Sequence, residues 1–406
     1  MSASSPVPET VVMAWSLPDP VVKKSAVVTG AGGQDGSYLC EHLLDLGYEV
    51  HGTVRHKSGG DPEGRLANCM RNPDFRAHTL DITDRSAVDA LVGSVFPDEL
   101  YHLAAMSHVG VSFKNPTMTF DNNVTGTLNV LESVRHLSPM TRVYFAGTSE
   151  MFGGAPGTAP QNESTHMRPK SPYAISKLAG FNLCQIYRSS YGMYVSCGIL
   201  FNHESSRRGK LFVTRKITRA VAEIVAGNRE LVELGNVDAV RDWGHAKDYV
   251  RAMHDMLQLP TGTDLVIGTG RTHTVRQFAE AAFAHAGIPL EWRTEGGLDV
   301  AVDAHGKRRV SSDPDLFRPT ECSFLEADPR LAGIVIGWER DAAAFEKLVA
   351  EMVDADVAEV ETENVVAAAA AKGRGRGRRA LAWGLSPVAI GVLAGILTTV
   401  ASALTA

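Results

Sequence analysis

The stretch "KKSAVVTGAGGQDGSYLCEHLLDLGYEVHGTVRH" (residues 23–56) predicts a strand, a glycine loop, a helix and a second strand. Its apolar run at 26–29 suits a buried parallel strand. Leucines then recur at helical spacing, at Leu39, Leu43 and Leu46, until a glycine ends the helix. This order of elements predicts an α/β fold, a Rossmann-type doubly wound parallel sheet.

The loop between strand and helix carries three glycines at three-residue spacing. Glycine permits a tight turn and lets the backbone approach a pyrophosphate, whose charge the helix N-terminus stabilises. An ordinary tight turn would also need glycine. The position of the loop between a strand and a helix favours dinucleotide binding. The cofactor-binding candidates here are Gly30, Gly33, Gln34, Asp35 and Gly36.

The end of the second strand reads "TVRHKS", with Arg55, His56 and Lys57 followed by Ser58. NAD-binding sites usually place an acidic residue at this position. A cationic cluster instead suits the adenosine 2′-phosphate, so NADP is the predicted cofactor. The alternative is a solvated loop with ordinary surface charge.

Three more strands are predicted, in "FRAHTLDITD" (75–84), "ELYHLAAMSHV" (99–109) and "RVYFAGTSE" (142–150), with a helical stripe of apolar residues at 124–134. Doubly wound sheets bind ligands at the carboxyl ends of their strands. The residues at these ends are therefore further cofactor candidates: Asp81, Ile82, Leu103, Ala104, Ala105 and Ser107.

Tyr173 and Lys177 lie four residues apart in a helical pattern, which puts both on one face. A phenol has a pKa of about 10, which is high for a base at neutral pH. The ammonium and a nicotinamide charge are expected to lower that pKa. Thr148, at the end of a predicted strand, would hydrogen-bond the hydroxyl being oxidised.

Several stretches closely resemble one family, the GDP-mannose 4,6-dehydratases, which belong to the extended short-chain dehydrogenases/reductases. The matches span about residues 24–356 and are "TGAGGQDGSYL", "TSEMFG", "SPYAISKL", "GILFNHESSRRG", "FVTRKITRAVA", "LGNVDAVRDWGHAKDYV" and "FRPTE". The resemblance implies an NADP enzyme with a smaller C-terminal α/β substrate domain. It also implies a homotetramer that converts GDP-mannose to GDP-4-keto-6-deoxymannose on the route to GDP-fucose and related sugars.

The resemblance also implies roles for the residues of the reacting centre. Glu150 would be the general base at C5 and the acid for the departing C6 hydroxyl. Tyr173 would take the C4 hydroxyl proton, while Lys177 tunes it and holds the nicotinamide ribose. Ser149 matches this family, because dTDP-glucose dehydratases carry Asp there. The alternative for Glu150 is a salt-bridged or solvent-facing loop carboxylate.

By the same resemblance, Asn202 touches the substrate, while His203 and Arg208 contact the cofactor. Arg207 and Arg208 belong to a loop that, in this family, reaches the NADP of a neighbouring subunit. Further substrate candidates, each of which could instead be a surface residue, are Lys216, Arg241, Arg318 and Glu321. Three positions depart from the family pattern: Met118 replaces a Tyr, His56 replaces an Arg, and "SSRRG" replaces a proline-containing loop.

The expected organisation is a disordered leader (1–23), a mainly NADP-binding domain (24–200), a mainly substrate-binding domain (201–356) and a linker (357–379). The chain is expected to interleave between the two domains. The linker carries the basic run "KGRGRGRR". Residues 380–406 contain no charged residue and follow arginines, which predicts a transmembrane tail anchor facing the cytosol. The alternative is a soluble Ala-rich helix.

Charge and cysteine content bear on the class of protein and on its compartment. The net charge of −6 does not suggest nucleic-acid binding. The 5 cysteines contain no Cys-x-x-Cys pair, which favours free thiols in the reducing cytoplasm, and no metal-ligand spacing is present. The competing functions are a related nucleotide-sugar epimerase or reductase, and a non-catalytic NADP-binding scaffold.

Overall fold

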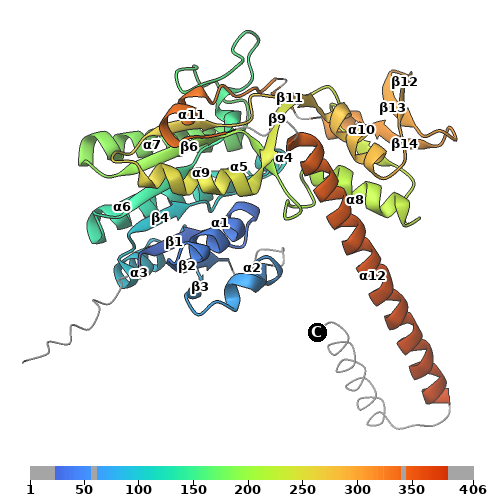
Figure 1. Cartoon of the computed structure of the whole chain (residues 1–406), viewed down its shortest axis with the longest axis horizontal. Helices are drawn as coiled ribbons and strands as arrows, with labels where there is room; N and C mark the ends of the chain where they lie inside the picture. Colours follow the sequence, from blue (N-terminus) through green and yellow to red (C-terminus); the bar gives the residue numbers. More distant parts are fainter. Residues whose placement is uncertain (1–22, 56–61, 318, 323, 340–343, 383–406) are drawn as a thin grey trace, which may run out of the picture.

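The computed structural model describes residues 23–55, 62–317, 319–322, 324–339 and 344–382 (Figure 1). Residues 1–22 of the predicted leader lie outside these ranges. The predicted tail anchor also lies outside them, except for residues 380–382, which end a long helix. Within the described ranges, no helix has the length and apolar character needed to cross a membrane.

The larger lobe is built on a seven-stranded sheet in which every neighbouring pair is parallel. The strand order is β10-β6-β5-β4-β1-β2-β3, so the Rossmann-type sheet predicted from the glycine-loop region is confirmed. The strands are β1 (Ser25–Thr29), β2 (Glu49–Val54), β3 (Phe75–Thr79), β4 (Glu99–His102), β5 (Arg142–Ala146), β6 (Val195–Leu200) and β10 (Asp264–Ile267).

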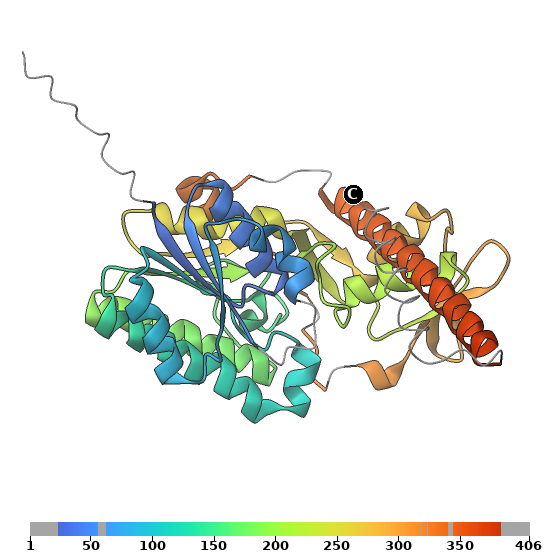
Figure 2. The same cartoon turned by 90° about the horizontal axis from the view of Figure 1, so that it is seen from below.

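Helices cover both faces of this sheet (Figure 2). Along β1, Val27 joins the core on one face, whereas Ala26 and Val28 join the core on the other, as the strand period of two requires. The first face carries α3 (Arg85–Val95), α6 (Gly126–Leu137) and α7 (Pro172–Tyr191), and the second carries α1 (Gln34–Asp45), α2 (Pro62–Met70), α9 (Ala246–Gln258) and α11 (Arg330–Ile336). Short helices α4 (Val109–Lys114) and α5 (Pro116–Phe120) and the π-helix η1 (Asp121–Thr125) precede α6.

The smaller lobe has its own core, built from two small sheets and three helices. One sheet has the order β11-β9-β7 and the other β12-β13-β14-β8. The elements are β7 (Asn202–Glu204), α8 (Val213–Val225), β8 (Val232–Leu234), β9 (Val240–His245), β11 (Thr272–Thr274), α10 (Val275–His285), β12 (Glu291–Glu295), β13 (Leu298–Val302), β14 (Arg308–Ser312), the 3-10 turn η3 (Pro314–Leu316) and α12 (Ala344–Ala382).

The chain passes between the lobes several times. After β9 it returns to the large sheet as α9 and β10, and after η3 it returns again as α11. The last crossing places α12 against α8 and α10. The two lobes are therefore interleaved along the sequence.

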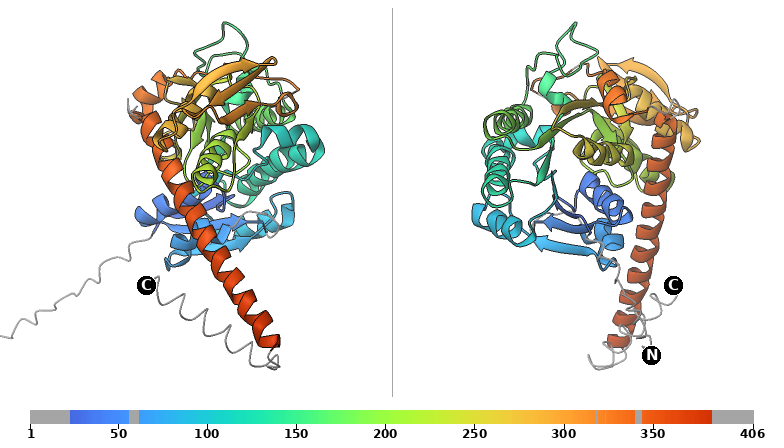
Figure 3. Two further views of the ribbon diagram at one scale, coloured as in Figure 1. Left: turned by 90° about the vertical axis from the view of Figure 1, so that its right-hand side faces the viewer. Right: turned by 60° about the vertical axis from the view of Figure 1, so that its left-hand side comes forward.

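Helix α12 shows the conformation of the predicted linker. It runs continuously from Ala344 to Ala382 and so includes residues 357–379. Its first half is packed, and the buried pair of Arg215 Nε and Asp356 Oδ1, 2.7 Å apart, fastens it to α8. Val360 is buried, and residues 361–369 are exposed. The outer half extends away from the smaller lobe (Figures 1 and 3). The alanine run at 367–371 supplies the strongest helix former, which the linker prediction neglected.

Candidate active site

A cavity of about 680 Å³ opens at the carboxyl ends of the parallel strands, with both lobes contributing to its lining. Residues directly after β1, β4, β5 and β6 line it, as expected for a doubly wound sheet. Most of the predicted site residues meet there: Gly30, Gly33, Gln34, Asp35, Gly36, Arg55, Ile82, Leu103, Ala104, Ala105, Ser107, Thr148, Ser149, Glu150, Tyr173, Lys177, Asn202, His203, Arg208, Lys216, Arg241 and Glu321.

The glycine loop forms a tight cradle at one end of the cavity. Gly30 has φ +72°, and a Cβ there would stand 2.9 Å from the Ala104 backbone. A Cβ at Gly36 would stand 2.3 Å from the Gly30 carbonyl oxygen. Helix α1 then begins at Gln34, after a Gly33 cap that brings no side chain over the first turn. This backbone leaves room for an anion at the helix N-terminus, so the loop fits a pyrophosphate.

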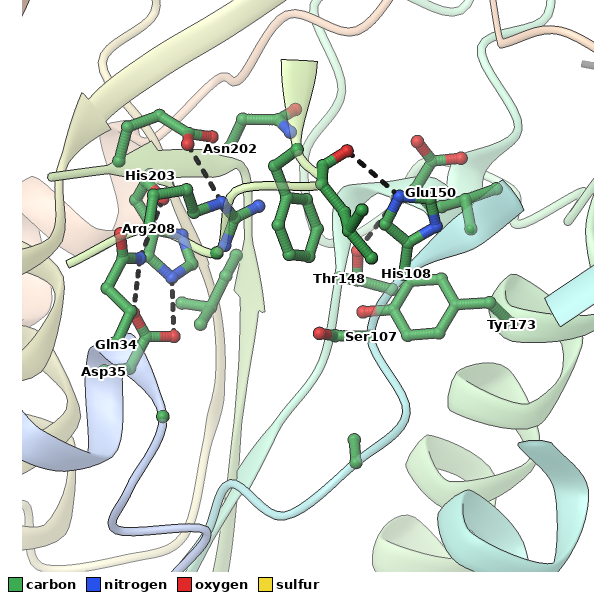
Figure 4. Close-up of a pocket in the computed structure, with 18 of the residues that line it drawn as sticks. Gln34, Asp35, Ser107, His108, Thr148, Glu150, Tyr173, Asn202, His203 and Arg208 are labelled. Carbon is green, nitrogen blue, oxygen red and sulfur yellow. Dashed lines mark hydrogen bonds and ion pairs between the residues drawn. The ribbon is translucent and has the colours of Figure 1, made fainter. Parts of the chain in front are cut away.

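A polar network fastens the cradle to the start of the smaller lobe. Gln34 Nε2 donates to the His203 carbonyl at 3.1 Å, and His203 Nε2 lies 2.8 Å from Asp35 Oδ2. Figure 4 shows these residues together with Arg208 at one side of the cavity. Burial alone would lower the pKa of His203, but the Asp35 carboxylate outweighs it and the pKa is raised. Burial alone would raise the pKa of Asp35, but His203 outweighs burial and the pKa of Asp35 is lowered.

Two arginines lie near the end of β2. Arg55 Nη1 donates to Asn122 Oδ1 at 3.0 Å, and Arg65 Nη1 donates to the Gly32 carbonyl at 3.1 Å. All of these residues line the cavity. Sequence analysis missed Arg65 and Asn122 because they belong to separate helices that only the tertiary fold brings beside β2. The other predicted members of the cationic cluster, His56, Lys57 and Ser58, lie outside the described residues.

At the other side of the cavity, Thr148, Glu150 and Tyr173 lie together (Figure 4). Thr148 caps the 3-10 turn η2 (Ser149–Phe152), with its Oγ1 accepting from the Glu150 amide at 3.3 Å. Its side chain also lies beside Tyr173 (Figure 4) and acts to lower the pKa of that phenol. Glu150 and Tyr173 are only 8% and 7% exposed. The alternative of a solvent-facing carboxylate at Glu150 is therefore excluded.

The start of α7 sets the position of Tyr173 and Lys177. Ser171 caps this helix by accepting from the Ala174 amide at 3.1 Å, and a proline occupies its first turn. Lys177, one turn after Tyr173, is 4% exposed and its Nζ donates to the Ala146 carbonyl at 2.9 Å. The helix thus brings a phenol and an amine into a nearly dry site.

Burial makes a contribution to the pKa of Tyr173 that the sequence argument did not include. Burial raises the pKa of Tyr173 to about 12, and the Glu150 carboxylate adds to the rise while the Thr148 hydrogen bond opposes it. Burial also lowers the pKa of Lys177 to about 8. Desolvation thus acts against the lowering expected in the complex with a nicotinamide, which stays a prediction.

The structure describes four of the five predicted substrate residues. Arg241 Nη2 lies 3.1 Å from Glu321 Oε1, and both line the cavity with Asn202 and Lys216. Arg318 lies outside the described residues. One cofactor candidate, Asp81, does not line the cavity; it is exposed and its Oδ1 accepts from the Thr83 amide at 2.9 Å.

The loop after β7 makes contacts that the sequence did not predict. The buried Glu204 pairs with Arg208 at 2.9 Å, and the Arg208 guanidinium lies 3.7 Å from the Phe212 ring centroid. His108 Nε2 lies 3.2 Å from the Leu211 carbonyl oxygen, so the loop is joined to the N-terminus of α4. Arg207 reaches α1 of its own chain, where Nη2 is 2.8 Å from Glu41 Oε1. No motif spacing predicts these cross-lobe contacts.

A glycine cradle followed by a buried Thr, Tyr and Lys on a seven-stranded parallel sheet defines an extended short-chain dehydrogenase/reductase. Comparisons with known proteins agree and go further. The family model "GDP-mannose 4,6 dehydratase" matches residues 27–352. The chain is 44% identical over 350 residues to GDP-mannose 4,6 dehydratase 2 of Caenorhabditis elegans, covering 84% of this chain and 91% of that protein. The chain belongs to the GDP-mannose 4,6-dehydratase family.

Solved structures share the fold at lower identity. The UDP-glucose 4-epimerase of Thermus thermophilus in complex with NAD matches with 25% identity and a TM-score of 0.68, over 82% of this chain and 98% of that one. RMD from Pseudomonas aeruginosa, complexed with NADPH, matches with 19% identity and a TM-score of 0.65, over 83% and 100%. Both comparisons show that the fold is shared.

Proposed function

We propose that this protein is an NADP-dependent hydro-lyase that converts GDP-mannose to GDP-4-keto-6-deoxymannose. The single observation that carries the proposal is the placement of Glu150 beside Thr148 and Tyr173 at one side of the cavity. An alcohol oxidation requires only the phenol and the amine. A buried carboxylate beside them adds a group that can remove a carbon-bound proton.

The residues of the cradle are those proposed to hold NADP. The first turn of α1 receives the pyrophosphate, Arg55 and Arg65 receive the 2′-phosphate, and Lys177 receives the nicotinamide ribose. When bound, NADP supplies a hydride acceptor for C4 and a hydride donor for C6. His203 neutralises Asp35 beside the cradle, which removes a like charge from the anion site.

The protein's own residues then carry the protons. Tyr173 accepts the C4 hydroxyl proton, with Thr148 orienting that hydroxyl. The resulting ketone acidifies the neighbouring C5 hydrogen, and Glu150 removes it. Glu150 then gives a proton to the C6 hydroxyl, which leaves as water. Each step needs its proton donor or acceptor within hydrogen-bond reach of one sugar ring. The three side chains lie together at one side of the cavity, which supports this requirement.

We place the nucleotide diphosphate of the substrate on the smaller lobe. Arg241 and Lys216 line that part of the cavity, and an arginine fork binds phosphate oxygens bidentately. Asn202 and Glu321 complete the proposed substrate set. The family resemblance further supports a homo-oligomer, and five buried free cysteines support a reducing compartment such as the cytoplasm.

The decisive experiment is incubation of the purified protein with NADP and GDP-mannose in deuterium oxide, followed by mass spectrometry and proton NMR. We expect a 4-keto-6-deoxy product that carries deuterium at C5. A product that keeps its C6 hydroxyl would point to an epimerase or a reductase. NADP binding with no product would point to the scaffold alternative.

A further inference from the structure

The loop between β7 and α8 carries a cation into the cavity. The Arg208 side chain lies at the cradle side, together with His203 and Gln34 (Figure 4). Gly209 and Phe212 of the same loop also line the cavity. The position of the Arg208 guanidinium therefore depends on what holds the backbone of this loop.

Arg215, in the first turn of α8, holds that backbone. Its Nη1 donates to the Arg208 carbonyl at 3.2 Å and also to the Ser206 carbonyl. Arg215 is only 6% exposed, and it belongs to the stretch "FVTRKITRAVA" (212–222), of which the proposed function uses only Lys216. One guanidinium nitrogen thus fixes two carbonyls of the loop that carries Arg208.

The other edge of the Arg215 guanidinium faces α12, which packs against α8 (Figure 1). Its Nε lies 2.7 Å from Asp356 Oδ1 and 2.8 Å from Asp356 Oδ2, and its Nη2 lies 2.6 Å from Glu359 Oε2. Asp356 is 0% exposed, and Thr218 Oγ1 donates to its Oδ2 at 2.6 Å. Because a guanidinium is planar and rigid, the two carboxylates of α12 determine where Nη1 points.

We propose that Arg215 is a positioning residue for Arg208: it transmits the position of α12 to the loop, so that α12 helps to hold a cation in the cofactor-binding part of the cavity. The proposal rests on the proposed function, in which NADP occupies that part of the cavity. It gives α12 a role in cofactor binding, although none of its described residues lines the cavity.

The Arg208 side chain is held at both of its ends. At the guanidinium end, the buried Glu204 of β7 pairs with it at 2.9 Å. At the backbone end, Arg215 holds the carbonyl. Loss of the second support leaves the ion pair with Glu204 in place but gives the loop more freedom. Binding of an anion would then have to remove that freedom, which lowers affinity.

The main test compares Arg215→Lys with the parent in the full-length protein, by calorimetric titration with NADP. A lysine can still pair with Asp356, but a compact ammonium does not reproduce the fork that also reaches both loop carbonyls. We expect the Kd for NADP to rise about 3- to 10-fold, as for the loss of one hydrogen bond. In an Arg208→Met background, the same substitution should change the Kd by less than about twofold, because the cation to be positioned is gone.

Arg188→Lys is the matched control. Arg188 likewise joins a carboxylate, that of Asp264, to a backbone carbonyl, that of Val195, and these three residues do not line the cavity. This substitution should leave the Kd for NADP within about twofold of the parent. A similar loss of affinity in Arg188→Lys, or full additivity of Arg215→Lys and Arg208→Met, overturns the proposal, since either result shows a general effect of reduced stability.

A second measurement needs no substitution. Coupling between two sites is reciprocal, so NADP should stabilise the part of α12 that contacts Arg215. Hydrogen exchange of the parent, followed by mass spectrometry, should become slower at residues 350–360 when NADP is added. The β12–β13 hairpin (291–302), in the same lobe but outside the cavity lining, should change less. An equal change in the two segments overturns the proposal. A parent that binds no NADP would instead count against the proposed function.

Discussion

His203 and Asp35 meet across the boundary between the lobes, with Nε2 and Oδ2 2.8 Å apart. Asp35 lies in the first turn of α1, where the glycine cradle fits a pyrophosphate. A carboxylate at that position would repel the anion, and the neighbouring imidazolium offsets it. The strand that begins the smaller lobe therefore completes the binding site of the larger one.

Removing this compensation should weaken cofactor binding. We expect His203→Gln to raise the Kd for NADP about 10-fold, and Asp35→Asn in the same background to restore it, as measured by calorimetry. Since the pKa of His203 is raised, the imidazolium is present at low pH, and the parent's affinity should fall as pH rises through that pKa. His285→Gln, which breaks the exposed pair with Asp354, is the control. A pH-independent affinity in the parent would contradict this role.

Cofactor choice should depend on the arginines beside β2. Arg65→Ala is expected to weaken NADP binding about 10-fold or more and to leave NAD binding nearly unchanged, because only NADP carries the 2′-phosphate. Arg71→Ala, further along the same region but bonded to Asn68, serves as the control. Equal losses for both cofactors would show that Arg65 supports the loop at Gly32 instead.

Glu150→Gln should separate oxidation from elimination. Cofactor affinity is expected to stay within about twofold, while C5 exchange falls at least 100-fold, because the amide cannot accept the proton. The readout is deuterium at C5 in the recovered sugar nucleotide. Glu233→Gln on β8, an exposed residue outside the cavity, controls for charge. Normal exchange in Glu150→Gln would remove Glu150 from the mechanism.

Oxidation at C4 should follow the ionisation of Tyr173. The pKa of this phenol is raised to about 12, so its ionised fraction, and with it the rate of the first hydride transfer, should increase with pH over the neutral range. Stopped-flow absorbance of the reduced nicotinamide measures that rate. Tyr173→Phe is expected to abolish the signal at every pH. A rate that does not change with pH would rule out ionisation of the phenol as limiting.

Lys177 should leave a signature in the stability of the free protein. Its pKa is lowered to about 8 by burial, so the unfolded chain binds the proton more tightly than the folded one between about pH 8 and 10.5. Its contribution to the free energy of unfolding therefore rises with pH across this window, by about 3 kcal/mol in all. The free energy of unfolding, measured by urea denaturation at several pH values, should rise with pH more steeply in the parent than in Lys177→Met. An equal pH dependence in the two proteins would contradict a lowered pKa at Lys177.

The sequence predicted those parts of the site that each lie within one short segment of the chain. The glycine loop between β1 and α1, and the Tyr173–Lys177 pair on α7, each lie within one short segment whose geometry follows from residue spacing. Arg65 and Asn122 could not be predicted, because each reaches the cavity only through packing between distant segments. The contribution of burial to the pKa of Tyr173 was not predictable for a similar reason, since burial is a property of the whole fold.

The helical conformation of the predicted linker was not foreseen, for a different physical reason. The charge run and glycines near the C-terminus are typical of a flexible connection, yet α12 continues through them. An alanine run and a well-anchored first half favour continuation, because extending an existing helix avoids the cost of nucleation. The ion pair of Arg215 and Asp356 belongs to that anchor.

Interleaving of the two lobes has a consequence for how this enzyme can be divided or recombined. A protein cut after Leu200 would lose the edge strand β10 and the helices α9 and α11, which cover one face of the large sheet. Neither half is thus a transferable module. Changes of specificity on this scaffold must come from individual side chains within loops, and not from exchange of a terminal portion.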